Sequence, residues 1–370
     1  TPLRVLRHPH YRMIWIASFG SNVGGWMEMV GVQWVMAEAT LAPAWVEAGR
    51  PSAPVMMGYL AVAQMAPVLL LGLVGGVVSD RVNRKKLLLI TQFLMMLIAI
   101  GLAIDAALGD ISPAVLMLLG ALHGVVMAFN MPAWGVLTPR LVPREDLADA
   151  IVLNGLQFNM ARVVGPALGG VLMGWTGATG LFVINAVSFI GVQLAISRTP
   201  DAPAPPRREG SSAWRELREA FAFAFRERGP LALTLAIFAF SMLATPLLRM
   251  LPIVVHDVYK ADADAFGLLL AFMGAGAVTG ALTVRMIPAW YPRHHFIPLS
   301  VVGGGLAMGA TAAAPSFALA AICIYFCGVF WMWVFNSSFA ALQLLVDDRM
   351  RGRVMSIVNV LSFGAMPLGA

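Results

Sequence analysis

The sequence predicts an all-α membrane protein made of two similar halves of membrane-spanning helices. Hydrophobic residues make up 59% of the chain and charged residues 12%, whereas soluble domains carry about 25% charged residues. The mean hydropathy is +0.79. Long apolar stretches alternate with short polar segments, and many approach the roughly 20 helical residues that cross a bilayer. These observations indicate a polytopic membrane protein rather than a soluble domain.

The apolar stretches predict eleven spans. In chain order they cover about 11–38, 53–79, 87–107, 112–138, 149–173, 178–197, 230–256, 265–288, 295–314, 316–345 and 354 onward. The last is cut at Ala370, and we expect a twelfth span to be missing after it. The net charge of +6 follows this topology, so it does not indicate a nucleic-acid partner.

The basic residues predict the orientation. If the segments between spans alternate sides, 21 of the 25 Lys and Arg residues share the side of the N-terminus. The opposite side holds Arg50 and Lys260, and Arg162 and Arg249 fall within spans. Because Lys and Arg are enriched in cytoplasmic loops, the N-terminus is expected in the cytoplasm.

Residues 198–229 divide the chain. They begin with a stretch rich in Pro and Ala and continue with apolar residues at helical spacing, including Trp214 and Phe221. This predicts a cytoplasmic linker with an amphipathic helix on the inner leaflet. We therefore expect a six-helix bundle at 1–197 and a second, truncated bundle at 230–370.

The two halves carry an internal repeat. Residues 76–81 align with 280–285, and residues 142–145 align with 346–349, both at an offset of 204. A repeat over six spans is typical of transporters with two related halves.

A short basic loop joins the second and third spans, and its charge alone predicts a turn that sets topology. Its Gly-x-x-x-Asp-Arg-x-x-Arg-Lys spacing resembles the signature loop of the major facilitator superfamily, with Asn83 where that family usually has Gly. The matching residues are Gly76, Asp80, Arg81, Arg84 and Lys85. The resemblance implies the major facilitator fold, two pseudo-symmetric six-helix bundles, and a cytoplasmic latch at these five residues.

The fifth span contains a second motif. It resembles the fifth-helix motif of major facilitator antiporters, with Ala161 at the first Gly position. The residues concerned are Arg162, Gly165, Pro166, Gly169 and Gly170. The resemblance implies an exporter. Plain helix packing, with Arg162 bonded to a neighbour, is the alternative.

Two further stretches, 139–147 followed by Asn154 and 348–355, are similar to the branch that contains enterobactin exporters and macrolide efflux proteins. This resemblance implies a monomeric transporter of the bacterial inner membrane. It would export a siderophore or lipophilic drug by proton antiport and alternating access, with the small molecule, protons and lipid as its partners. A proton-coupled uptake symporter and a non-transporting scaffold or sensor remain the alternatives.

Two titratable side chains within spans are candidates for proton coupling. Glu28 is the acid deep within the first span, and a carboxyl group removed from water can exchange a proton near neutral pH. His123 in the fourth span can also titrate. The superfamily's fourth-helix Arg is replaced by Gly120, so Glu28 or His123 is expected to serve. A structural Glu28 and a neutral buried His123 are the alternatives.

Further residues within the spans are candidates for the substrate cavity: the polar ones because such groups are costly in lipid, and Trp26 because it shares one face of the first span with Asn22 and Gln33. They are Asn22, Trp26, Gln33, Asn130 and Arg249. Helix contact is the alternative for Asn22, Trp26 and Gln33, and snorkelling towards the interface is the alternative for Arg249.

Common motifs for other chemistry are missing from the sequence. There is no Walker loop, H-E-x-x-H, C-x-x-C or G-x-S-x-G pattern, so we expect neither ATP drive nor enzymatic activity. No metal or cofactor is expected, and Cys323 and Cys327 are expected to be apolar filler.

Overall fold

The computed structural model describes residues 2–109, 111–200, 226–286 and 293–346, together with Val354 and Val358. Throughout these residues the regular structure is helical. Two predictions, the amphipathic helix near Trp214 and the span from 354 onward, lie outside the described residues, apart from the two valines.

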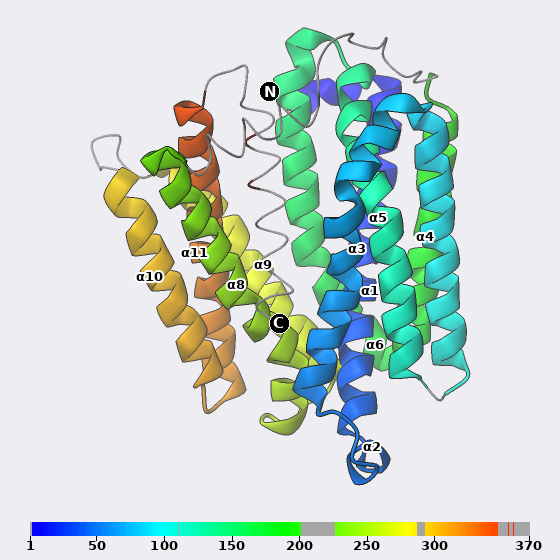
Figure 1. Ribbon diagram of the computed structural model, residues 1–370, viewed down its shortest axis with the longest axis vertical. Helices are drawn as coiled ribbons and strands as arrows, with labels where there is room; N and C mark the ends of the chain where they lie inside the picture. Colours follow the sequence, from blue (N-terminus) through cyan, green and yellow to red (C-terminus); the bar gives the residue numbers. More distant parts are fainter. Residues whose placement is uncertain are drawn as a thin grey trace. The chain divides into compact units, whose positions relative to one another are not determined.

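The described helices follow the predicted spans closely (Figure 1). The first half contains η1 (Pro2–Arg7), α1 (Pro9–Leu41), α2 (Pro43–Glu47), α3 (Ala53–Arg81), α4 (Arg84–Ala107), α5 (Pro113–Leu141), η2 (Arg144–Asp146) and α6 (Leu147–Ser197). The second contains α8 (Arg228–Asp257), α9 (Ala263–Thr283), η3 (Val284–Met286), α10 (Arg293–Ala312) and α11 (Phe317–Leu345). Within the described residues, eight helices are long and apolar enough to cross a membrane. The predicted all-α membrane fold is confirmed.

The helix starts follow local sequence signals. Proline occupies the first turn of α1, α3 and α5, where its missing N–H costs no hydrogen bond. The side chain of Asn83 accepts a hydrogen bond from the backbone N–H of Lys86 at 3.2 Å and so caps α4. The turn between α3 and α4 is therefore as short as the sequence predicted.

One helix boundary differs from the prediction. The spans expected at 149–173 and 178–197 are joined within α6 by a single non-helical residue, Gly177, with φ 64° and ψ −174°. A positive φ of this size favours glycine, which has no Cβ to clash. The chain therefore changes direction without a connecting loop, and the expected four-residue gap is wrong.

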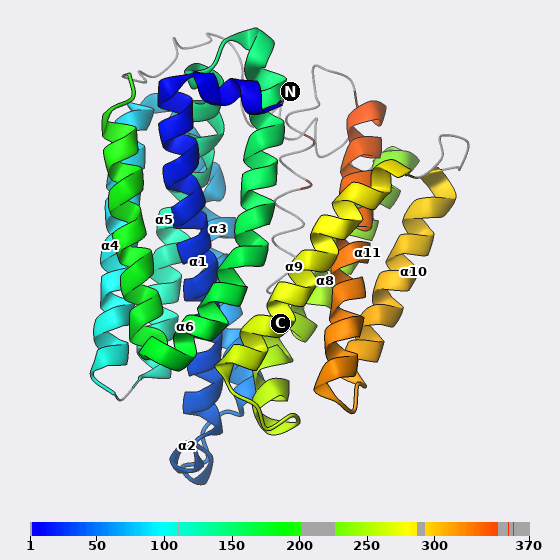
Figure 2. The same cartoon turned by 180° about the vertical axis from the view of Figure 1, so that it is seen from behind.

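The chain forms two compact units. The first comprises Thr1–Pro205 and Met250–Ala271, and the second comprises Pro206–Arg249 and Phe272–Ala370. In the first unit α1 packs along α6, α3 along α5, and α4 along both α5 and α6 (Figure 2). The domain boundaries expected at 198–229 stay a prediction.

Glycines allow close helix packing in both units. A methyl group added at Gly124 on α5 would collide with the backbone oxygen of Gln64 on α3. One added at Gly328 on α11 would collide with the backbone oxygen of Met273 on α9. The two glycines lie at the same 204-residue offset as the sequence repeat. Small residues at such contacts let membrane helices approach closely.

Two apolar layers join the helices of the first unit. One layer joins α1, α4, α5 and α6 through Ile14, Leu88, Leu137, Val192 and Ile196. Another joins α4, α5 and α6 through Met95, Ile98, Val126 and Phe189. These layers hold α1, α5 and the second half of α6 in the register that builds the site.

Candidate functional site

The centre of the candidate site is Glu28 on α1. Its side chain is buried, with 8% of the residue surface exposed. The Nδ2 atom of Asn185 on α6 donates a hydrogen bond to its Oε2 atom at 2.5 Å. Its Oε1 atom lies 3.9 Å from Nδ1 of His123 on α5. The site thus combines an acid, an imidazole and an amide from three helices.

The two proton-coupling candidates from the sequence are therefore neighbours. Glu28 and His123 were expected as alternatives, yet their side chains lie close enough to form an ion pair when the imidazole is protonated. A buried carboxylate beside an imidazole can exchange a proton with it. Whether they couple transport to protons stays a prediction.

Sequence reasoning missed Asn185. The residue is 1% exposed and lies in the apolar run Phe182–Ser188. The available signal was the rule that polar side chains within membrane spans are costly and mark function. The sequence alone could not show that this amide faces Glu28, because their contact depends on how α1 packs against α6.

The predicted cavity residue Asn22 lies on the face of α1 that contacts the first half of α6. Its Nδ2 atom donates to Oε1 of Gln157 at 3.2 Å, and Nε2 of Gln157 donates to the backbone oxygen of Trp15 at 3.0 Å. Farther along α1, Gln33 is 5% exposed. A role for Asn22 and Gln33 in a substrate cavity stays a prediction.

Trp26 and Arg162 form a second constellation on these helices. The guanidinium carbon of Arg162 lies 5.7 Å from the centre of the Trp26 ring, within the range of a cation–π contact. The ring of Phe158 meets Trp26 edge-on, with 5.9 Å between centroids. A guanidinium beside one aromatic ring, which in turn meets a second, is suited to a ligand that combines aromatic and anionic groups.

The glycines of the fifth-span motif bring three helices together in the first unit. A methyl group at Gly165 would collide with the side chain of Trp26, and one at Gly169 would lie 3.2 Å from Cα of Met27, both on α1. One at Gly170 would lie 2.8 Å from Cα of Gly267 on α9. Pro166 lies inside the same helix. The motif therefore forms close helix contacts, and its link to export stays a prediction.

The predicted latch residues lie at the turn between α3 and α4. Arg84 is 4% exposed and its Nε atom donates to the backbone oxygen of Ser79 at 3.1 Å. Lys85 donates from Nζ to the backbone oxygen of Thr199, after α6, at 2.6 Å. Gly76 lies within α3 and Arg81 is exposed. The side chain of Asp80 lies outside the described residues, so its role stays a prediction.

The two remaining cavity candidates lie on α5 and α8. Asn130 on α5 is buried and donates from Nδ2 to Oγ1 of Thr91 on α4 at 2.8 Å, which is a helix contact. Arg249 lies within α8. Their part in substrate binding stays a prediction.

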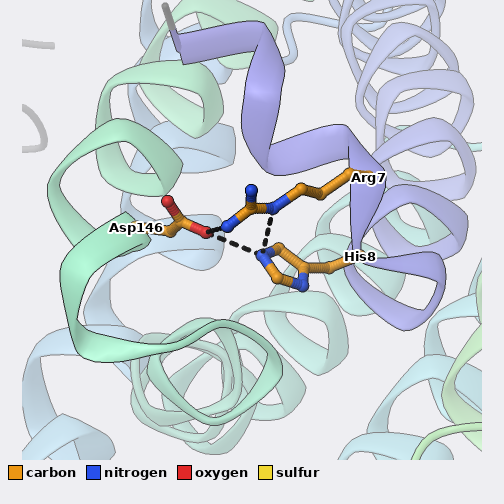
Figure 3. Close-up of polar contacts among 3 residues, drawn as sticks. All are labelled: Arg7, His8 and Asp146. Carbon is orange, nitrogen blue, oxygen red and sulfur yellow. Dashed lines mark hydrogen bonds and ion pairs between the residues drawn. The ribbon is translucent and has the colours of Figure 1, made fainter.

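A polar cluster outside the spans was not predicted. Asp146 in η2 accepts a hydrogen bond from Nη2 of Arg7 at 2.8 Å, and Nε2 of His8 lies 2.7 Å from the same Oδ2 atom (Figure 3). The contact with His8 and the nearby Arg7 hold the pKa of the Asp146 carboxyl below its ordinary value, against a smaller opposing effect of burial. The cluster fastens the N-terminal η1 to the turn between α5 and α6.

Nothing in the described part of the chain resembles a metal centre, since no group of three or more His, Cys, Asp or Glu side chains there could hold an ion. The polar chemistry available at the site is therefore that of a carboxylate, an imidazole, amides and a guanidinium.

Known proteins resemble the chain over its whole length. A family model described as "transmembrane secretion effector" matches residues 1–370. The enterobactin exporter EntS of Citrobacter koseri is 27% identical over 366 residues, covering 98% of this chain and 84% of the exporter. EntS of Salmonella typhi is 26% identical over 366 residues, with the same coverage.

Solved structures share the fold. A bacterial homologue of the human lysosomal transporter Spinster, in an inward-facing and unoccupied conformation, matches with a TM-score of 0.73 and 15% identity over 98% of this chain and 81% of that one. A D-xylose-proton symporter matches with a TM-score of 0.72 and 14% identity over 98% of this chain and 88% of that one. The family match over every residue, with this fold, shows that the chain belongs to the transmembrane secretion effector family of major facilitator exporters, which are membrane transporters and not enzymes.

Proposed function

We propose that this transporter exports a siderophore or lipophilic drug from the cytoplasm in exchange for protons. The observation that carries the proposal is the burial of Glu28 between Asn185 and His123. An ionisable group inside a membrane protein is costly and usually serves function. Glu28 and His123 together offer a place where a proton can be loaded and released.

The coupling follows from the two charge states of Glu28. When the carboxyl group is protonated the site is less negative, and when it is ionised the site attracts cationic groups. If substrate binding and protonation favour different conformations of the transporter, each drives the other in an alternating-access cycle. Two bundles rocking about a central cavity would then carry the substrate outward as protons move inward.

The substrate class is supported by chemistry and by relatives. The two curated relatives named above are enterobactin exporters, which favours a siderophore. Trp26, Phe158 and Arg162 offer aromatic surface and one cation, which suits an aromatic siderophore and also many lipophilic drugs. Arg249 is proposed as a further contact for an anionic group.

The membrane setting completes the proposal. The distribution of Lys and Arg supports a cytoplasmic N-terminus, and the bacterial relatives support the inner membrane. We propose that the transporter acts as a monomer. The latch, formed by Gly76, Asp80, Arg81, Arg84 and Lys85, would stabilise the outward-open state from the cytoplasmic side.

Everted membrane vesicles test the proposal. Respiration acidifies their lumen, and a fluorescent dye reports the pH gradient while enterobactin, erythromycin or ethidium is added. An antiporter lets protons leave as it takes up its substrate, so the gradient falls with one of the three. The fall should be absent in Glu28→Gln and present in Glu38→Gln, because Glu38 is an exposed acid on the same helix.

The direction of transport distinguishes export by antiport from uptake by symport. A D-xylose-proton symporter shares the fold, so the fold leaves the direction of transport open. Accumulation of labelled substrate in vesicles that are acid inside supports antiport, whereas accumulation only when the outside is acid supports uptake symport. A folded protein that moves none of the three substrates under either gradient would contradict the export of these compounds.

A further inference from the structure

The two carboxylate oxygens of Glu28 make different contacts. Oε2 accepts the hydrogen bond from Nδ2 of Asn185, and Oε1 lies towards Nδ1 of His123. An amide cannot titrate in this pH range, so the Asn185 contact fixes the direction of the carboxylate without competing for its proton. The oxygen nearer His123 is therefore the one free to exchange a proton.

Asn185 is itself held in place. The hydroxyl group of Ser188 donates to the backbone oxygen of Asn185 at 2.7 Å and lies 3.3 Å from its Oδ1 atom. Oδ1 lies on the side of Ser188, and Nδ2 faces α1 and Glu28. The donor thus reaches Glu28 from a prearranged position.

Gly24 provides the space for this contact. It lies four residues before Glu28, on the same face of α1. A methyl group added at Gly24 would lie 2.7 Å from Oδ1 and 3.2 Å from Cα of Asn185. The missing side chain therefore lets α6 approach until its amide reaches Glu28. The neighbouring Gly25 has no atom within 4 Å of such a methyl group.

We propose that Asn185 is a positioning residue for proton coupling. Its amide holds one oxygen of Glu28 so that the other faces His123, and a proton can pass between carboxyl and imidazole or to water. Within the described residues, Glu28 makes polar contacts with His123 from α5 and with Asn185 from α6. Of these two, His123 is the titratable partner. This inference rests on the proposed role of Glu28.

Infrared difference spectroscopy tests the proposal without a substrate. The full chain is reconstituted in liposomes and titrated with acid, and the carboxyl band of Glu28 is identified by its loss in Glu28→Gln. Asn185→Leu keeps a similar shape but removes the donor. Because an ionised carboxylate loses a hydrogen bond, the midpoint of the Glu28 titration should move to higher pH, by about a tenfold change in proton concentration.

Matched glycine variants provide an independent test. Gly24→Ala pushes against Asn185 and should move the midpoint in the same direction, whereas Gly25→Ala should leave it at the wild-type value. An unmoved midpoint in Asn185→Leu, or equal effects of the two glycine variants, would overturn the positioning role while leaving Glu28 as the proton site. If no titrating carboxyl band is lost in Glu28→Gln, Glu28 does not exchange a proton, and the proposed function itself is contradicted.

Discussion

Glu28 on α1 and His123 on α5 place a carboxylate oxygen and an imidazole nitrogen 3.9 Å apart. Each side chain on its own has an ordinary structural explanation, since a buried acid can pair with any donor and a partly exposed imidazole can hydrogen-bond to water. Together they form a pair of titratable groups within the helices of a membrane transporter. Their proximity makes a shared role in proton movement testable.

The imidazole should tune coupling rather than carry it alone. In His123→Gln the side chain still makes hydrogen bonds but no longer titrates. We expect transport to persist with a changed pH dependence, because Glu28 loses its titratable neighbour. Initial rates of substrate uptake into everted vesicles across a pH series would measure this. A complete loss of coupling, equal to that of Glu28→Gln, would show that His123 is the proton carrier.

The latch prediction concerns Asp80, which lies next to Arg81 at the end of α3. Asp80→Asn should slow turnover by about fivefold, the effect expected from losing a single ion pair, while substrate affinity changes little. Asp80→Glu keeps the charge and should recover part of the rate. Single-turnover and steady-state transport in liposomes would separate these quantities. Wild-type turnover in Asp80→Asn would rule out the latch.

Gly124 should be needed for packing between α3 and α5. Gly124→Ala forces a methyl group against the backbone oxygen of Gln64, and overpacking of this kind costs about 1–3 kcal/mol. Gly135→Ala is the matched control on the same helix, because nothing lies within 4 Å of its added methyl group. Thermal unfolding in detergent should show a lower Tm for the first variant only. Equal Tm values would contradict the close helix contact.

The Asp146 cluster should make the N-terminal segment sensitive to acid. The pKa of Asp146 is lower in the folded chain than its ordinary value. Its ionised form therefore stabilises the fold at neutral pH, and this stabilisation is lost as the pH falls through the folded pKa. We expect residues 2–8 to loosen below about pH 4, where carboxyl groups normally become protonated.

Hydrogen exchange of η1 amides, corrected for the intrinsic effect of pH, would measure that loosening. Asp146→Asn should exchange faster than wild type at neutral pH, and the two should converge in acid. Glu145→Gln, at an exposed neighbouring acid, should behave as wild type. Slow exchange in Asp146→Asn at neutral pH would show that apolar contacts alone hold η1.

The sequence was sufficient to predict the helices because each span has a length and polarity set by the bilayer. It placed the starts of α3 and α4 within three residues, where Pro54 and Asn83 act as local signals. The sequence did not predict the kink at Gly177, because a short gap between apolar runs is consistent with either a loop or a kink. The backbone angle that decides between them depends on how the two parts of α6 pack.

The site was predictable residue by residue but not as an arrangement. Glu28 and His123 each stood out as polar groups in apolar spans, yet their distance depends on the packing of α1 against α5 and α6. Asn185 carries no charge and belongs to no motif, so its role emerges only from the hydrogen bond to Glu28. Asp146 was missed because an acid in a polar turn usually remains in solvent.

The attachment of η1 affects how this protein can be labelled. Val5 is fully buried beside Tyr11 and Leu153. Asp146 binds Arg7 and His8, which follow Val5 in the chain. A spin label or fluorophore at exposed Leu3 would therefore move together with α6. Such a probe could report movements of the first unit during transport at a point remote from Glu28.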